Sequence, residues 1–82
     1  MYLVKFDNNP EVEEFNATDI EDLMLLLADY TNNDRNYLEK AMNGFKKDND
    51  KEHKYIQLFN DLFARYASGE VSAIYEIKDK WE

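Results

Sequence analysis

Residues 55–77, YIQLFNDLFARYASGEVSAIYEI, change their hydrophobic period partway along, and this change decides the fold class. In the first half, apolar residues recur at the spacing of an amphipathic helix: Tyr55, Ile56, Phe59, Leu62, Phe63 and Tyr66. Gly69 can take the left-handed conformation that ends a helix. Apolar and polar residues then alternate as in a strand whose buried face carries Val71, Ala73, Tyr75 and Ile77. We therefore expect a central helix followed by a C-terminal strand, with Ile74 on its exposed face.

The first sixteen residues predict a pair of short strands. Tyr2 to Phe6 mixes aromatic and branched apolar residues, and residues 7–10, Asp-Asn-Asn-Pro, have the composition of a turn. Residues 12–16 would form a second strand that pairs with the first. Val12 and Phe15 depart from a strict period of two, which indicates a bulge or an edge strand.

An amphipathic helix is expected to follow these strands. Thr18 and Glu21 have the spacing of a capping box, in which the two side chains satisfy free amides at a helix start. The apolar stripe of this helix consists of Ile20, Leu23, Met24, Leu27 and Tyr30. Residues 31–33, Thr-Asn-Asn, compete for backbone hydrogen bonds and should end the helix.

A second helix is predicted from residue 34 to about residue 47. Its apolar residues form two adjacent rows, one of Tyr37, Ala41 and Phe45 and one of Leu38 and Met42. Asn49, with Glu52 three residues later, then offers an N-cap for the third helix.

These elements predict an α+β domain: an N-terminal β-hairpin, three amphipathic helices and a C-terminal strand that completes a small, mostly antiparallel sheet. The chain has 82 residues, of which 44% are hydrophobic, enough for one core and too few for two. No repeat or linker divides the chain, so residues 1–82 are expected to form a single compact domain. An all-helical fold is the alternative if residues 1–17 are irregular.

The charge of the chain is concentrated near its beginning. The formal net charge is −8, and the first 34 residues, with nine acidic residues and one basic residue, account for all of it. Binding to nucleic acids and to anionic membrane surfaces depends on Lys and Arg, so neither is expected. The first two fifths of the chain should instead project a negative field.

The residue types needed for catalysis are scarce. The chain has no Cys, one His and two Ser, and it lacks a glycine-rich phosphate loop. His53 lies two positions before Tyr55, on the opposite side of the third helix, so an exposed imidazole is expected there. The sequence thus predicts a protein that is not an enzyme, with no catalytic residue and no cofactor.

No specific metal site is predicted either. Residues 48–52, Asp-Asn-Asp-Lys-Glu, begin like a calcium loop, but the sixth position is His53 where the turn needs Gly. The twelfth position is Phe59 where a bidentate Glu is needed.

One group of residues suggests recognition of a partner protein. On the first helix Leu25 falls outside the apolar stripe, next to Asp22 and Asp29, so we expect an exposed apolar side chain with an acidic rim. The predicted partner-binding residues are Glu11, Glu13, Glu14, Asp22, Leu25 and Asp29. The leading hypothesis is a non-enzymatic acidic protein-binding module that docks its acidic N-terminal face on a basic, nucleic-acid-binding surface of a larger protein.

Mimicry of nucleic acid is the sharpest form of this hypothesis. Carboxylates three or four positions apart on a helix are about 5–6 Å apart at Cβ, comparable with successive phosphates. In size and acidity the chain is similar to the small acidic proteins by which phages inactivate host nucleic-acid-handling and defence enzymes. This similarity is one of composition, involves no motif, and implies an inhibitor.

The alternative is a structural or accessory protein that self-associates, for example as a homodimer, while its acidity serves solubility. The contact would use an apolar surplus: Tyr2, Leu25, Ile74 and Trp81.

A cytoplasmic location is expected from the absence of Cys. The longest apolar run, Leu23 to Ala28, is also far shorter than the roughly 20 residues that span a bilayer.

Overall fold

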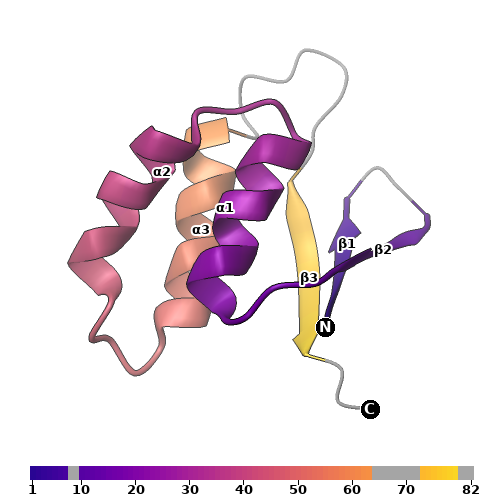
Figure 1. The fold of residues 1–82 in the computed structure, drawn as a ribbon, viewed down its shortest axis with the longest axis horizontal. Coiled ribbons are helices and arrows are strands. Elements are labelled where there is room, and N and C mark those ends of the chain that lie inside the picture. Colours follow the sequence, from indigo (N-terminus) through magenta and orange to yellow (C-terminus); the bar gives the residue numbers. More distant parts are fainter. Residues whose placement is uncertain (8–9, 64–72, 80–82) are drawn as a thin grey trace.

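The computed structural model describes residues 1–7, 10–63 and 73–79. In chain order the elements are β1 (Tyr2–Phe6), β2 (Val12–Phe15), α1 (Ile20–Tyr30), α2 (Arg35–Met42), the 3-10 turn η1 (Asn43–Phe45), α3 (Lys51–Phe63) and β3 (Ile74–Asp79). The strands form one antiparallel sheet in the order β2-β1-β3. The predicted α+β arrangement is confirmed (Figure 1).

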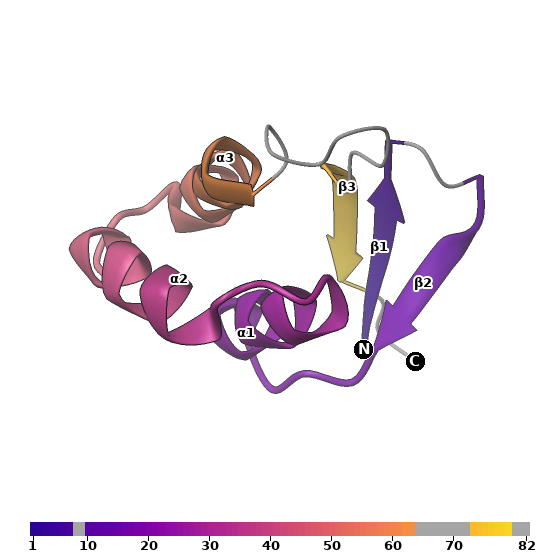
Figure 2. The same ribbon diagram turned by 90° about the horizontal axis from the view of Figure 1, so that it is seen from above.

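The helices lie together on one side of the sheet, and α2 is the helix farthest from the strands (Figure 2). One cluster of buried side chains joins all three helices to β1 and β3: Val4, Phe6, Ile20, Leu23, Met24, Leu27, Ala28, Leu38, Met42, Tyr55, Phe59 and Ile74. Burying apolar area is the main favourable term in folding, so this cluster is what holds the helical layer to the sheet.

A bulge in β3 reverses the predicted orientation of Ile74 and Tyr75, whereas Ile77 packs against the core cluster as predicted. Lys5 of β1 lies opposite Glu76, but the next residue, Phe6, lies opposite Ile74, so Tyr75 is an extra residue in β3. An extra residue shifts the alternation of side chains by one position. Ile74 is therefore buried with Phe6, and Tyr75 is 66% exposed. The prediction that Tyr75 faces the core and Ile74 faces solvent is wrong for this reason.

Helix α1 begins with a capping box one residue later than predicted. Asp19 is the N-cap, and its carboxylate accepts the Asp22 amide at 2.8 Å. The Asp22 carboxylate in turn accepts the Thr18 amide at 3.1 Å. Glu21, predicted to take part in the cap, instead reaches α3. Both spacings occur in the sequence, and the tertiary contact of Glu21 decides between them.

The end of α1 is confirmed at residues 31–33. Asn32 has a φ of 64°, a left-handed conformation that Asn tolerates better than most residues. The amide of Asn33 donates to the Ala28 carbonyl at 2.8 Å and the amide of Asn32 donates to the Asp29 carbonyl at 3.1 Å. This pair of bonds satisfies carbonyl groups that the helix leaves free.

The other two helices depart from the predictions on their outer sides and at their ends. In α2, Leu38 and Met42 are buried, but Tyr37, which was predicted in the adjacent apolar row, is 55% exposed. At the start of α3, Asp48 rather than Asn49 provides a side-chain acceptor, for the Asp50 amide. Tyr66, Gly69 and Val71, on which the predicted helix end and strand start depended, lie outside the described residues.

A side-chain amide ties α3 to β3. Asn60 Nδ2 donates to the Ile74 carbonyl at 3.1 Å, and the Ile74 amide donates to Asn60 Oδ1 at 2.8 Å. Asn60 therefore binds both backbone groups of Ile74 in the way that a neighbouring strand would.

Candidate functional site

Strand β2, an edge of the sheet, carries Glu13 and Glu14, and Glu11 immediately precedes it. Glu13 lies opposite Val4, on the face that the helices cover, and Glu14 lies opposite Leu3, on the other face. Successive residues of a strand point to opposite faces. The single acidic face predicted for these residues is therefore divided between the two faces of the sheet edge.

The predicted residues on α1 are more engaged than the sequence suggested. Asp22 belongs to the capping box, and Asp29 forms an ion pair with Arg35 at 3.2 Å. Leu25 is partly buried and packs against the core cluster. The prediction that Leu25 is an exposed anchor is wrong, because its side chain reaches the core cluster although the period of α1 places it outside the apolar stripe.

Tyr30 connects the last turn of α1 to the sheet. Its ring stacks on Phe6 with 5.9 Å between centroids and meets Phe15 of β2 edge-on at 5.3 Å. Although Tyr30 is 54% exposed, these contacts hold the Asp29 end of α1 against the sheet. The Asp29 end of α1 therefore lies beside the sheet, but the carboxylates of α1 and β2 do not form one continuous surface, because Glu14 lies on the face of the sheet opposite the helices.

The basic residues are separated from the β2 edge. Among the residues that the structure describes, six of them lie on or between α2 and α3: Arg35, Lys40, Lys46, Lys47, Lys51 and Lys54. Strands β1 and β3 carry the other two, and both are directed to β3: Lys5 lies over the Tyr75 ring at 5.5 Å, and Lys78 lies 3.7 Å from Glu76. Since α2 and β2 occupy opposite ends of the molecule, the acidic and basic groups are unevenly distributed in space (Figure 1).

Glu21, which the sequence assigned to the α1 cap, is instead the centre of a polar network with α3. Its carboxylate accepts hydrogen bonds from Lys51 Nζ at 2.8 Å and from the hydroxyl of buried Tyr55 at 3.2 Å. Burial acts to raise the pKa of Glu21, but the hydrogen bonds and the Lys51 charge outweigh it and hold that pKa below its ordinary value. Burial and the Glu21 carboxylate raise the pKa of Tyr55 to about 12. All three groups are internally satisfied, so this network serves to join α1 to α3.

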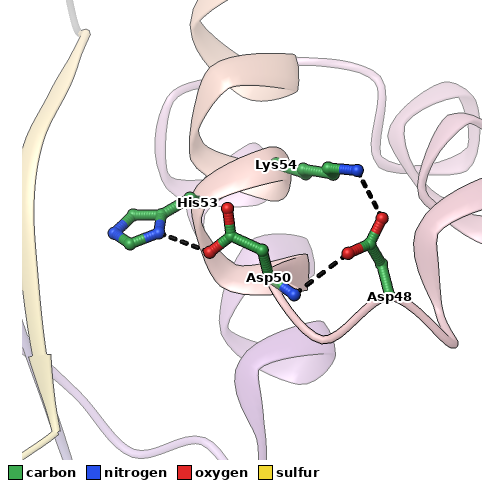
Figure 3. Close-up of polar contacts among 4 residues, drawn as sticks. All are labelled: Asp48, Asp50, His53 and Lys54. Atoms are coloured by element: carbon green, nitrogen blue, oxygen red, sulfur yellow. Dashed lines mark hydrogen bonds and ion pairs between the residues drawn. The ribbon is translucent and has the colours of Figure 1, made fainter.

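A second polar cluster surrounds the start of α3. His53 Nδ1 lies 2.6 Å from Asp50, and Lys54 pairs with Asp48 (Figure 3). His53 is 82% exposed, as the sequence predicted. The hydrogen bond to Asp50, followed by the charge of that carboxylate, raises the pKa of His53 above its ordinary value. Each charge in this cluster has a partner of opposite sign, which is the pattern of a solvated helix start.

Because the folded-state pKa of His53 is raised, its bond to Asp50 stabilises the fold at pH below about 6.5. This contribution is lost as the pH rises through the folded-state pKa. We expect an NMR titration of the imidazole to give a pKa above that of a free histidine, and Asp50→Asn to return it toward that value.

Glu52→Gln is the matched control for this titration, because Glu52 contributes the weakest of the shifts and makes no hydrogen bond to the ring. Equal pKa values in the native protein and in Asp50→Asn would show that the pair does not form.

A surface pocket of about 290 Å³ lies between η1 and α3, lined by Phe45, Lys54, Gln57, Leu58 and Asp61. Lys54 Nζ lies 5.7 Å from the centre of the Phe45 ring and forms an ion pair with Asp48. The positive charge of Lys54 is therefore balanced within the protein. Among its lining residues, no nucleophile and base, or acid and base, are hydrogen-bonded to each other as a catalytic pair would be.

Within residues 1–7, 10–63 and 73–79, no three His, Cys, Asp or Glu side chains are grouped so as to hold a metal ion. In the same ranges, no helix has both the length and the apolar character to cross a membrane. Comparison with protein-family models, with curated proteins and with solved structures finds no match to this chain.

Proposed function

We propose that the chain is a non-enzymatic acidic protein-binding module that acts in the cytoplasm. It docks its acidic N-terminal residues, on β2 and α1, on a basic surface of a larger protein. The surface that we favour is one that normally binds nucleic acid, so that docking inhibits the partner as the small acidic proteins of phages do.

The separation of charge in space is the observation that carries this proposal. Glu11, Glu13 and Glu14 stand at one edge of the sheet, while most of the described basic residues stand on the helices. Such an asymmetry steers a basic partner to one side of the molecule and sets the orientation of docking. A protein whose acidity serves solubility alone does not need such an asymmetry.

The burial of three apolar residues argues against the self-association alternative. Ile74 is buried, and Tyr2 and Leu25 pack against the core cluster. Three of the four residues that a homodimer contact was expected to use are therefore occupied within one copy. Trp81, the fourth, lies outside the described residues.

The test is capture of partners by tagged protein from a lysate of the source organism, eluted with a salt gradient. We expect a dominant nucleic-acid-binding protein released at moderate salt, since the screening length falls from about 10 Å at 0.1 M to about 3 Å at 1 M. Glu14→Lys should weaken binding of that purified partner about tenfold, corresponding to about 1.4 kcal/mol.

Glu39→Lys is the matched control, because it makes the same change in net charge on the exposed side of α2, far from β2 (Figure 1). Asp22→Lys and Asp29→Lys are less suitable, since Asp22 caps α1 and Asp29 pairs with Arg35. Equal loss of binding in Glu14→Lys and Glu39→Lys would show that binding depends on the net charge of the protein and not on the position of Glu14. Recovery of the bait alone, as a dimer, would refute the proposal in favour of self-association.

A further inference from the structure

The hydrogen bonds of Asn60 reveal which way the backbone groups of the sheet point. Both the amide and the carbonyl of Ile74 bind the Asn60 side chain, so both point away from β1. Residues of an antiparallel pair alternate between those whose backbone groups bind each other and those whose groups point outward. Phe6, the partner of Ile74, therefore directs its backbone groups to the other side, toward β2.

The same alternation, followed along β1, assigns the outer edge of β2. Val4 and Tyr2 share the orientation of Phe6, so their partners Glu13 and Phe15 direct their backbone groups to β1. Val12 and Glu14 must then direct theirs away from the sheet.

The two edges of the sheet differ in how they are covered. On β3, the Asn60 amide occupies the outward groups of Ile74, a device that keeps an edge from pairing with another chain. On β2, no strand among the described residues adjoins the outer edge. An open edge of this kind is a template for an added strand, which main-chain hydrogen bonds hold in place.

We propose that the outer edge of β2 is the docking site of this module, and that its occupant is an extended basic segment of the partner protein, added as a fourth strand. This inference rests on the proposed function and specifies how the partner is recognised.

The side chains of β2 select the occupant. An added strand meets Val12, which is 51% exposed, and Glu14 on one face, and Glu13 and Phe15 on the other. The complementary segment therefore carries one basic and one apolar residue on each face, in the order apolar, basic, basic, apolar. A second copy of β2 fits poorly, because antiparallel pairing about its centre places Glu13 and Glu14 of the two copies opposite each other, and opposed like charges are destabilising.

The test uses the full chain and a synthetic six-residue peptide, TVKKVT, as the probe. Two N-methylated forms of the peptide, one with the odd and one with the even amides methylated, have the same charge. Only one of the two can donate hydrogen bonds to β2. We expect one methylated form to retain binding and the other to lose at least about tenfold in Kd, with chemical-shift changes of the protein confined to residues 11–15 and their β1 partners.

Glu14→Pro provides a second readout, because it removes an outward amide while leaving the bonds between β1 and β2 intact. It should abolish binding of TVKKVT, whereas Glu14→Gln, which keeps that amide, should weaken binding only severalfold. Circular dichroism checks that both variants fold. If Glu14→Pro does not fold, the pair of methylated peptides still decides the question.

Each outcome has a distinct meaning. Equal binding of the two methylated forms would overturn strand addition, because the position of the free amides would not matter. Docking driven by charge would remain possible, so the proposed function would stand. No binding of TVKKVT would overturn this docking site, while salt-sensitive capture of a basic partner would still support the proposed function. If that capture fails but one methylated form of the peptide binds and the other does not, the proposed partner class would be refuted. The outer edge of β2 would still be a docking site for an added strand.

Discussion

Phe59→Ala is expected to destabilise the fold by about 3–5 kcal/mol, the usual cost of removing a buried phenylalanine ring. Phe59 is fully buried in the core cluster, and its ring meets Phe63 edge-on with 5.1 Å between centroids. Truncation removes the apolar area of one ring and leaves a cavity that the neighbouring helices and strands fill only in part. Small domains are stable by about 5–15 kcal/mol in total, so this single change should unfold a large fraction of the molecules on mild heating.

Urea unfolding followed by circular dichroism measures this effect. The midpoint should fall strongly while the slope with urea stays unchanged, because the variant loses stability and not compactness. Gln57→Ala is the matched control on the same helix: Gln57 is exposed, and its truncation should stay within about 0.5 kcal/mol. Similar midpoints for the two variants would show that α3 does not pack on the core through Phe59.

Asn60→Ala is expected to have the second largest effect, a loss of about 2–4 kcal/mol. The change removes both hydrogen bonds to Ile74 and leaves an amide and a carbonyl of a buried residue without their partner. Each unsatisfied buried group costs about 1–3 kcal/mol. Amide hydrogen exchange gives the most direct readout, since the Ile74 amide should lose protection.

Asn60→Asp separates the two bonds. An ionised carboxylate still accepts the Ile74 amide but cannot donate to the Ile74 carbonyl, and the two oxygens repel each other. This repulsion raises the pKa of the new carboxyl, so the penalty is present above that folded-state pKa and falls as the pH drops through it. The difference in stability between this variant and the native protein should therefore narrow from pH 7 to pH 4. A constant difference over that range would refute the bond to the carbonyl.

Asn60 also explains why the strand-addition proposal concerns β2 rather than β3. The same bonds that stabilise the start of β3 block its outward groups at Ile74. An Asn60→Ala variant thus opens part of the β3 edge in addition to losing stability, and exposed edges promote association between chains. Stability and edge protection are joined in one side chain.

The structural surroundings of the proposed partner-binding residues were predicted in part. The sequence located the acidic residues and identified β2 as an edge strand or a bulged one, and the structure places it at the edge of the sheet. The sequence did not predict that Glu13 and Glu14 face opposite sides, although the period of two already implies it. It could not predict that Arg35 would neutralise Asp29 or that Leu25 would pack against the core, because both depend on how other elements lie against α1.

The sequence by itself determined the type and order of the elements. The strands near the start, the three helices and the final strand follow from local periodicity and from turn residues such as those at 31–33, because these depend on neighbours within a few positions. The net charge and its concentration in the first 34 residues were likewise visible from the sequence alone.

Only the tertiary structure decided how these elements meet. Glu21 leaves the predicted cap because Lys51 and Tyr55, 30 and 34 positions away, offer it stronger partners. The bulge at Tyr75 reverses the predicted faces of Ile74 and Tyr75, since the pairing with β1 sets where the extra residue falls. Asn60 covers the β3 edge at Ile74, whereas no strand among the described residues adjoins the outer edge of β2. Each of these outcomes depends on contacts between residues far apart in the chain, which no local pattern encodes.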